Sequence, residues 1–228
     1  MLDSDDVMHP TRVFEQVRYM LSLPEKERER TLLGCMFDRD PPDSTWHYAQ
    51  WANGLSDERL MLERFREVTV IQPTWMMCRA RFQQLGGYLE APPPSSGNTS
   101  TIEQFLRNEQ EFKGFKIPSQ DETLKLVHPA FESMQSLRFA EDLRFFHAHL
   151  HANGRLALCR TNNPSPLVTY RHRSNQSQSY QTSRKLLLHL RALAFETCVL
   201  EAKGQWQKNN GAFIVWGAGR DGKDFIKA

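Results

Sequence analysis

The sequence predicts an α/β fold, because short apolar runs of strand character alternate with longer runs of helical period. Strand-like runs occur at residues 31–37, 69–71, 155–159, 167–170 and 212–216. Helical patterns occur at residues 10–23, 44–51, 56–65, 78–85, 140–150 and 182–203. With 228 residues, of which 39% are hydrophobic, the chain can bury one sizeable core.

Proline and glycine mark the limits of several elements. Pro10 can occupy the first turn of a helix, and Pro24 ends that helix. Between them, apolar residues recur at helical spacing: Val13, Val17, Met20 and Leu21. The proline pair at 41–42 predicts a loop, and the glycine pair at 86–87 predicts a helix end.

Two groups of ring-bearing side chains stand out on predicted helices. Trp46, Tyr48 and Trp51 are close enough to stack on a base or a sugar, although such residues more often pack in a core. Three histidines alternate along the helix that begins at 140: His147, His149 and His151. A spacing of two spreads them around a helix, so we expect these histidines at the surface.

The composition excludes several classes of protein. A net charge of +2 gives no global electrostatic case for nucleic-acid binding. Four widely spaced cysteines contain no CxxC pair, which argues against a zinc site or a disulfide framework and suits a reducing compartment. No apolar run has the length of a membrane span, and the acidic N-terminus does not resemble a signal peptide. We therefore expect a cytoplasmic protein with no membrane partner.

The acidic run at the N-terminus is the strongest candidate for chemistry. Asp3 and Asp5 are two residues apart and follow Met1-Leu2, which we interpret as the end of a strand. Such a pair can face one divalent cation, and Mg²⁺ or Mn²⁺ prefers oxygen ligands that it often shares with substrate phosphates. The alternative is a solvated acidic terminus in which Ser4 or Asp6 caps the next helix.

Several segments resemble the family 2 glycosyltransferases, which have the GT-A fold and transfer a sugar from a nucleotide-sugar. The segments that carry this resemblance are residues 2–13, 140–150 and 167–173. Three more segments are similar to the branch of that family that galactosylates queuosine in tRNA: residues 34–60, 70–88 and 213–223. The resemblance spans most of the chain except about forty residues after Ala91.

The resemblance implies a metal-dependent, inverting transfer from a UDP-sugar. Asp3 and Asp5 match the ends of the acidic motif that binds Mn²⁺ or Mg²⁺ and the sugar diphosphate. Asp142 and Glu141 match the family's Glu-Asp pair. We expect Asp142 to accept the proton of the attacking hydroxyl and Glu141 to orient the substrate, although the reverse assignment stays open. Two carboxylates in the first turn are also favoured by the helix dipole alone.

Other site residues follow from the same resemblance. Thr74 and Trp75 match positions that line the acceptor pocket, and a core tryptophan is the alternative. Arg171 and Arg173 could neutralise a diphosphate or approach an RNA backbone. The family's Tyr-Arg-x-His element has Arg173 at its fourth position here, so no metal role passes to His172.

The resemblance also predicts how the chain is organised. We expect residues 1–204 to form the acceptor-side portion of a GT-A domain, with the nucleotide-binding half upstream of Asp3 and an insertion at residues 91–136. Residues 205–228 would form a linker and the start of a Rossmann-like appendage, cut short after a GxGxxG pattern that ends at Gly222. The expected reaction is transfer of galactose from UDP-galactose to queuosine in tRNA. The alternatives are a non-catalytic interaction or RNA-binding protein and an incomplete gene model.

Overall fold

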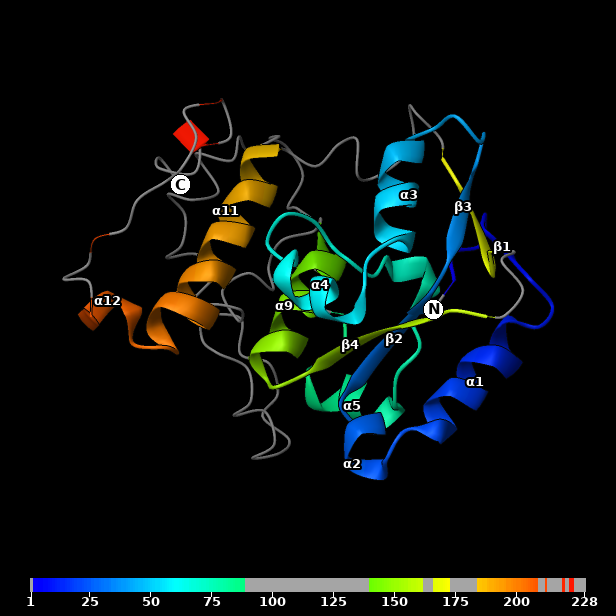
Figure 1. Ribbon diagram of the computed structural model, residues 1–228, viewed down its shortest axis with the longest axis horizontal. Coiled ribbons are helices and arrows are strands. Elements are labelled where there is room, and N and C mark those ends of the chain that lie inside the picture. Colours follow the sequence, from blue (N-terminus) through cyan, green and yellow to red (C-terminus); the bar gives the residue numbers. More distant parts are fainter. Residues whose placement is uncertain are drawn as a thin grey trace, which may run out of the picture. The chain divides into compact units, whose positions relative to one another are not determined.

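The computed structural model describes residues 2–88, 140–161, 166–172 and 184–208, together with positions 212, 219, 222 and 223 (Figure 1). It is a mixed α/β structure, which confirms the predicted class. The chain divides into two compact units. The first comprises Met1–Gln84 and Asn153–Ser177, and the second comprises Leu85–Ala152 and Gln178–Ala228. The predicted insertion at 91–136 and the last predicted strand at 213–216 lie outside the described residues.

Parallel strand pairs form the centre of the first unit. Strand β2 (Thr31–Cys35) pairs in parallel with β4 (Arg155–Cys159), so that Cys35 lies beside Cys159. Beyond Met36, β3 (Phe37–Asp40) pairs in parallel with β5 (Val168–Arg171). A short strand, β1 (Val7–Met8), adds antiparallel to β5, which gives the order β1-β5-β3.

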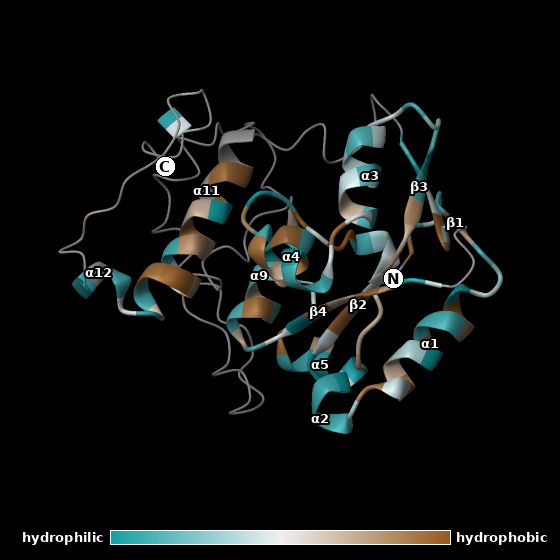
Figure 2. Ribbon diagram, in the orientation of Figure 1, coloured by the Kyte–Doolittle hydropathy of each residue, from teal (hydrophilic) through white to brown (hydrophobic). Residues whose placement is uncertain are grey.

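The apolar composition of these strands explains the core. All five residues of β2 are buried, and Figure 2 shows hydrophobic colouring along β2 and β4. Helix α1 (Arg12–Ser22) lies against β2 and β4 (Figure 1), and it ends before Pro24 as the sequence predicts. The buried residues of this core are Met20, Leu33, Cys35, Phe37, Ala49, Ala52, Ile71, Ala157, Cys159, Leu167 and Val168.

Short helices complete the first unit. They are α2 (Glu25–Arg28), α3 (Trp46–Asn53), α4 (Asp57–Leu62), the 3₁₀ turn η1 (Gln72–Thr74) and α5 (Arg79–Gln84). Ser56 caps α4, because its side chain accepts a hydrogen bond from the Arg59 backbone N–H. None of the helices that the structure describes combines the length and apolar character needed to cross a membrane.

The prediction of a strand at residues 69–71 is wrong. The backbone carbonyls of this segment accept hydrogen bonds from side chains and not from a neighbouring strand. The Tyr48 hydroxyl donates to the Val68 carbonyl at 2.7 Å, and the Trp75 indole N–H donates to the Val70 carbonyl at 2.6 Å. The Thr69 hydroxyl in turn donates to a carbonyl of α4 at 2.9 Å. The β-branched residues 68–71 are therefore buried without joining a sheet.

The second unit is helical in its described part. It contains α9 (Glu141–His151), α11 (Arg184–Phe195), a π-helical segment η4 (Glu196–Glu201) and α12 (Gln205–Lys208). The expectation that the histidines of α9 lie at the surface is wrong: His147 is 2% exposed and His149 is fully buried. Every residue from 143 to 149 is buried, so α9 has no solvent face over these two turns.

Gly34 lies where no side chain fits, and we expect Gly34→Ala to destabilise the fold. A Cβ at this position would lie 2.3 Å from the Val70 Cγ1 atom and 3.0 Å from the Thr74 Oγ1 atom. Such overpacking costs about 1–3 kcal/mol of unfolding free energy, measurable by urea denaturation. The control is the background Val70→Ala, in which the cost of Gly34→Ala should shrink. An equal cost in both backgrounds would contradict this account.

Burial of Cys35 predicts a loss of stability at alkaline pH. Desolvation, followed by the neighbouring Cys159, raises the pKa of the Cys35 thiol from 9.0 to about 12. Between these values the unfolded chain has released the thiol proton while the folded chain retains it, so the free energy of unfolding falls as pH rises. Cys35→Ala should flatten this slope in denaturation measurements.

Leu33→Ala is the control for Cys35→Ala, because it opens space in the same strand and removes no titratable group. It should lower stability at every pH and keep the wild-type slope. If Cys35→Ala kept that slope as well, the thiol would not be its source.

Candidate functional site

The pairing of β1 with β5 brings the acidic N-terminal segment to the Tyr170-Arg171 element. Val7 pairs with Thr169, so the residues just before β1 lie beside the end of β5. The Asp6 Oδ1 atom accepts a hydrogen bond from the Arg171 backbone N–H at 3.0 Å. Two segments separated by 165 positions therefore form one cluster.

Arg39 of β3 completes this cluster. Its guanidinium lies 4.1 Å from the centroid of the Tyr170 ring, 5.4 Å from that of Phe37 and 5.7 Å from that of Tyr48. The parallel register sets this geometry, because Arg39 is the β3 partner of Tyr170. Desolvation lowers the pKa of Arg39, while Tyr170, Tyr48 and the Asp6 charge act to raise it. The surrounding rings stabilise this half-buried cation.

Two carboxylates of the acidic segment, Asp3 and Asp6, have raised pKa values. Desolvation, followed by the Asp5 charge, raises the pKa of Asp3 above 3.8. Desolvation also raises the pKa of Asp6, although the hydrogen bond from Arg171 opposes this shift. The same surroundings raise the pKa of Tyr170, chiefly by desolvation. A cation placed among these carboxylates would relieve their mutual repulsion.

The donor atoms of the acidic segment fit a hard divalent cation. Asp3, Asp5 and Asp6 offer carboxylate oxygens, the ligands that Mg²⁺ and Mn²⁺ prefer. The Asp6 Oδ2 atom is buried and makes no hydrogen bond with the described part of the chain. Among the described residues, no group of three or more His, Cys, Asp or Glu side chains is arranged to hold a metal ion. A cation bound by the acidic segment would therefore need ligands from water or a substrate phosphate.

The structure describes one of the two arginines predicted for this site and not the other. Arg171 is exposed, and its Nε atom lies 3.4 Å from the Asp40 Oδ2 atom, so it forms a surface ion pair at the end of β5. Arg173 lies outside the described residues. Of this pair, the structure thus brings Arg171 to the acidic segment.

Thr74 and Trp75 are held in the core of the first unit. Thr74 is fully buried, and its hydroxyl donates to the Ile71 carbonyl at 2.7 Å. Trp75 is 2% exposed, yet it borders a cavity of about 490 Å³ that Arg12 and Arg79 also line. The apolar residues around this cavity are Leu2, Met8, Val13, Met76, Met77 and Phe82. Leu2 and Met8, which flank the acidic segment in the sequence, are the residues of the N-terminal segment that line this cavity.

Glu141 and Asp142 occupy the first turn of α9, in the second unit. Residue Ala140 precedes them with a left-handed backbone (φ 62°) and makes no side-chain cap. The Asp142 Oδ1 atom accepts a hydrogen bond from the Leu143 backbone N–H at 2.7 Å. Desolvation lowers the pKa of the buried Arg144, and the Glu141 charge opposes this shift. The pair thus sits at the positive end of a helix dipole, where carboxylates are stabilised.

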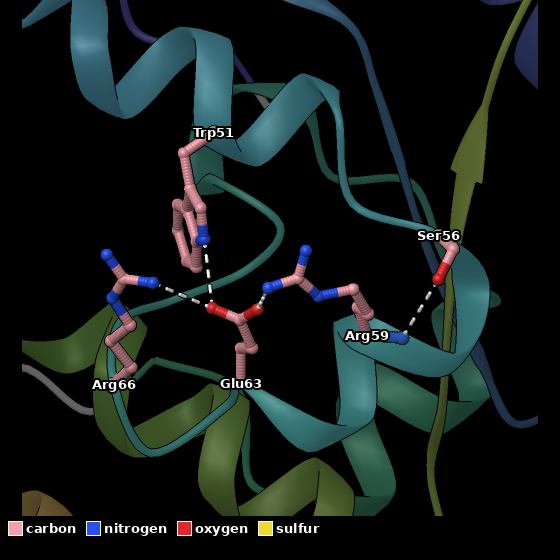
Figure 3. Close-up of polar contacts among 5 residues, drawn as sticks. All are labelled: Trp51, Ser56, Arg59, Glu63 and Arg66. Atoms are coloured by element: carbon pink, nitrogen blue, oxygen red, sulfur yellow. Dashed lines mark hydrogen bonds and ion pairs between the residues drawn. The ribbon is translucent and has the colours of Figure 1, made fainter.

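The aromatic helix α3 serves mainly to hold the fold. The Trp51 indole N–H donates to the Glu63 Oε2 atom at 2.9 Å, and Arg59 and Arg66 pair with the same carboxylate (Figure 3). Desolvation acts to raise the pKa of Glu63, but these donors and charges hold it below its ordinary value. In contrast, Trp46 is exposed. Trp51 is thus engaged in a polar network, whereas Trp46 and its neighbour His47 are exposed rings of α3.

Sequence reasoning missed the roles of Arg39 and Asp6 in this cluster. The proline pair at 41–42 predicts a loop, but Arg39 and Asp40 just before it belong to β3. The alternative in which Asp6 caps the next helix is wrong, because α1 begins at Arg12, after Thr11. The alternation of Phe37 and Arg39 in one apolar run was the signal that could have indicated a strand.

The comparisons with known proteins add no family to these observations. No family model matches the chain, and no solved structure matches it.

We expect Asp3 to titrate above its ordinary pKa of 3.8, because desolvation and the Asp5 charge both disfavour its ionised form. Asp5→Asn removes one of these causes and should lower the pKa of Asp3. The measurement is an NMR titration of the Asp3 carboxyl carbon. As a control, Asp43→Asn removes an exposed carboxylate of the loop after β3 and should leave the Asp3 curve in place. An Asp3 pKa that Asp5→Asn does not move would contradict this account.

Proposed function

We propose that this chain is a metal-dependent, inverting glycosyltransferase of family 2. Its donor is a UDP-sugar, UDP-galactose, and its acceptor is queuosine in tRNA. The donor and acceptor rest on the resemblance of residues 34–60 and 70–88 to that branch of the family. The alternative, a non-catalytic interaction or RNA-binding protein, is an outcome that the transfer assay separates from this one.

The observation that carries the proposal is the convergence of three resembling segments in one cluster. Asp6 lies in the resembling segment 2–13, Arg39 in segment 34–60, and Arg171 in segment 167–173. These segments are far apart in the sequence, so nothing local forces them together. Their meeting in one cluster supports a shared role in binding one ligand.

In the proposed reaction, the chain's residues hold the diphosphate end of the donor. Asp3 and Asp5 would bind Mn²⁺ or Mg²⁺, which would neutralise the charge that develops on the leaving diphosphate. Arg171 adds a positive charge at the end of β5, where a phosphate oxygen could pair with it. Trp75 borders the neighbouring cavity, in which the acceptor would lie.

The proposed proton acceptor is Asp142. The acceptor hydroxyl oxygen attacks the anomeric carbon, the bond from that carbon to the diphosphate oxygen breaks, and the hydroxyl proton passes to the Asp142 carboxylate. Glu141 orients the acceptor. The opposite assignment of these two carboxylates stays open, and separate substitutions distinguish them.

We also propose that the protein acts in the cytoplasm, where its tRNA substrate is found. All four cysteines are free thiols: Cys35, Cys78, Cys159 and Cys198. Free thiols suit a reducing compartment.

The test is transfer of labelled galactose from UDP-galactose to tRNA that contains queuosine, with Mn²⁺ present. Asp142→Asn should lower the rate about 10²–10⁴-fold, because it removes the proton acceptor. Asp3→Asn should raise the Mn²⁺ concentration needed for half-maximal rate. The exposed Asp43→Asn is the matched control and should behave as wild type. A tRNA that carries guanine in place of queuosine should accept no sugar.

Two results would overturn the assignment. Transfer that needs no divalent cation would remove the role of Asp3 and Asp5. A rate unchanged by both Asp142→Asn and Glu141→Gln would remove the proposed proton acceptor. Saturable tRNA binding with no transfer from UDP-galactose, UDP-glucose or UDP-N-acetylglucosamine would favour the binding protein instead.

A further inference from the structure

A cysteine and a histidine of the second unit lie in contact, outside the candidate site. The Cys198 Sγ atom lies 3.7 Å from the Nδ1 atom of His151, which is within hydrogen-bonding distance for sulfur. Cys198 belongs to η4, and His151 is the last residue of α9. Both side chains are half-buried, so a small reagent can reach them. A thiol beside an imidazole is a pairing that generates a nucleophilic thiolate near neutral pH.

The local structure favours proton transfer within this pair. In the tautomer that carries its hydrogen on Nε2, the Nδ1 atom of His151 can accept the thiol proton. The products are a thiolate and an imidazolium in contact, and their opposite charges stabilise each other. His151 also ends α9, where the partial negative charge of the last carbonyls stabilises a protonated imidazole. Cys198 lies in a π-helical segment, a rare geometry that is frequent at functional sites.

The surroundings of the other three cysteines favour the neutral thiol. Cys35 and Cys159 are buried, and desolvation raises the pKa of both, that of Cys35 to about 12. Cys78 is half-buried like Cys198, but its Sγ atom lies 3.6 Å from the Arg28 carbonyl oxygen. A carbonyl oxygen can only accept a hydrogen bond from the thiol, and this bond stabilises the protonated form. The contacts therefore single out Cys198 as the reactive thiol among the four.

We propose that Cys198 is a site of oxidation by hydrogen peroxide, with His151 as its proton acceptor. The thiol proton passes to His151, and the thiolate sulfur attacks one oxygen of the peroxide. A sulfur–oxygen bond forms as the oxygen–oxygen bond breaks, so the sulfur loses two electrons and the peroxide gains them. The hydroxide that leaves takes the imidazolium proton and becomes water. The product at Cys198 is a sulfenic acid.

The sulfenic acid is open to reaction with a small thiol. The sequence of the second unit contains no cysteine besides Cys198. Within that unit, only an added thiol such as glutathione can therefore convert the sulfenic acid to a disulfide.

This inference goes beyond the proposed function and does not depend on it. Neither Cys198 nor His151 belongs to the acidic cluster or to the carboxylate pair at the start of α9. Its test measures the modification of a side chain and not the transfer of a sugar, so either proposal can fail while the other stands.

The test is labelling of the native full chain, resolved for each cysteine. The reduced protein is treated with hydrogen peroxide and dimedone, which traps sulfenic acids, and peptide mass spectrometry then measures the label at each cysteine. Cys198 should be labelled at least about tenfold faster than Cys78, because its proton has an imidazole acceptor while that of Cys78 faces a carbonyl. Cys35 and Cys159 should be labelled only after denaturation. This comparison uses the wild-type chain and does not depend on the folding of a variant.

Substitution of the histidine tests its role as the proton acceptor. His151→Gln retains a polar side chain that cannot take up the proton, and it should slow the labelling of Cys198 about tenfold while leaving Cys78 at its wild-type rate. The matched control is His47→Gln, which removes an exposed imidazole of the first unit and should leave every rate unchanged. Circular dichroism checks that both variants are folded.

Equal labelling of Cys198 and Cys78 in the native chain would overturn the proposal. So would a folded His151→Gln variant in which Cys198 is labelled at the wild-type rate, because the thiol would then react without its proton acceptor.

Discussion

The parallel pairing of β2 with β4 is the constraint on which the first unit depends. It joins residues 31–35 to residues 155–159, which are separated by more than a hundred positions. The pairing continues beyond Met36 as β3 with β5. The register of these pairings determines which side chains at the ends of the strands are neighbours. Arg39 lies against Tyr170 for that reason, and the end of β5 lies where β1 can add to it.

The acidic cluster is therefore a consequence of strand register and not of local sequence. Asp6 reaches the Arg171 backbone only because β1 pairs with β5 just beyond it. The cluster places three carboxylates near a half-buried guanidinium and a tyrosine, and desolvation raises the pKa of Asp3, Asp6 and Tyr170. Functional sites often combine charge repulsion with desolvation in this way, because a bound ligand then relieves both. The neighbouring cavity gives such a ligand space.

The hydrophobic spacing of α1 predicts a helix, but it does not predict which face of that helix is buried. The inner face is polar because Gln16 satisfies a buried carbonyl in the η1 turn, and Arg12 in turn donates to Gln16. Hydrogen bonds lower the cost of burying these polar groups, whereas breaking the bonds would leave both groups unpaired. The apolar residues of α1 therefore point outward.

The sequence alone determined the fold class, the approximate limits of most helices and of β2 and β4, and the burial of residues 31–35. These follow from local properties: apolar runs, helical spacing, the Ser56 cap, and the stops at Pro24 and Gly86. The tertiary structure decided what depends on distant neighbours. It buries His147 and His149, and it leaves residues 69–71 outside any sheet. It also leaves the apolar face of α1 exposed and brings Asp6, Arg39 and Arg171 into one cluster. The physical reason is that a side chain's surroundings are set by strand register and by hydrogen bonds between segments far apart in the chain, and a local pattern contains no information about either.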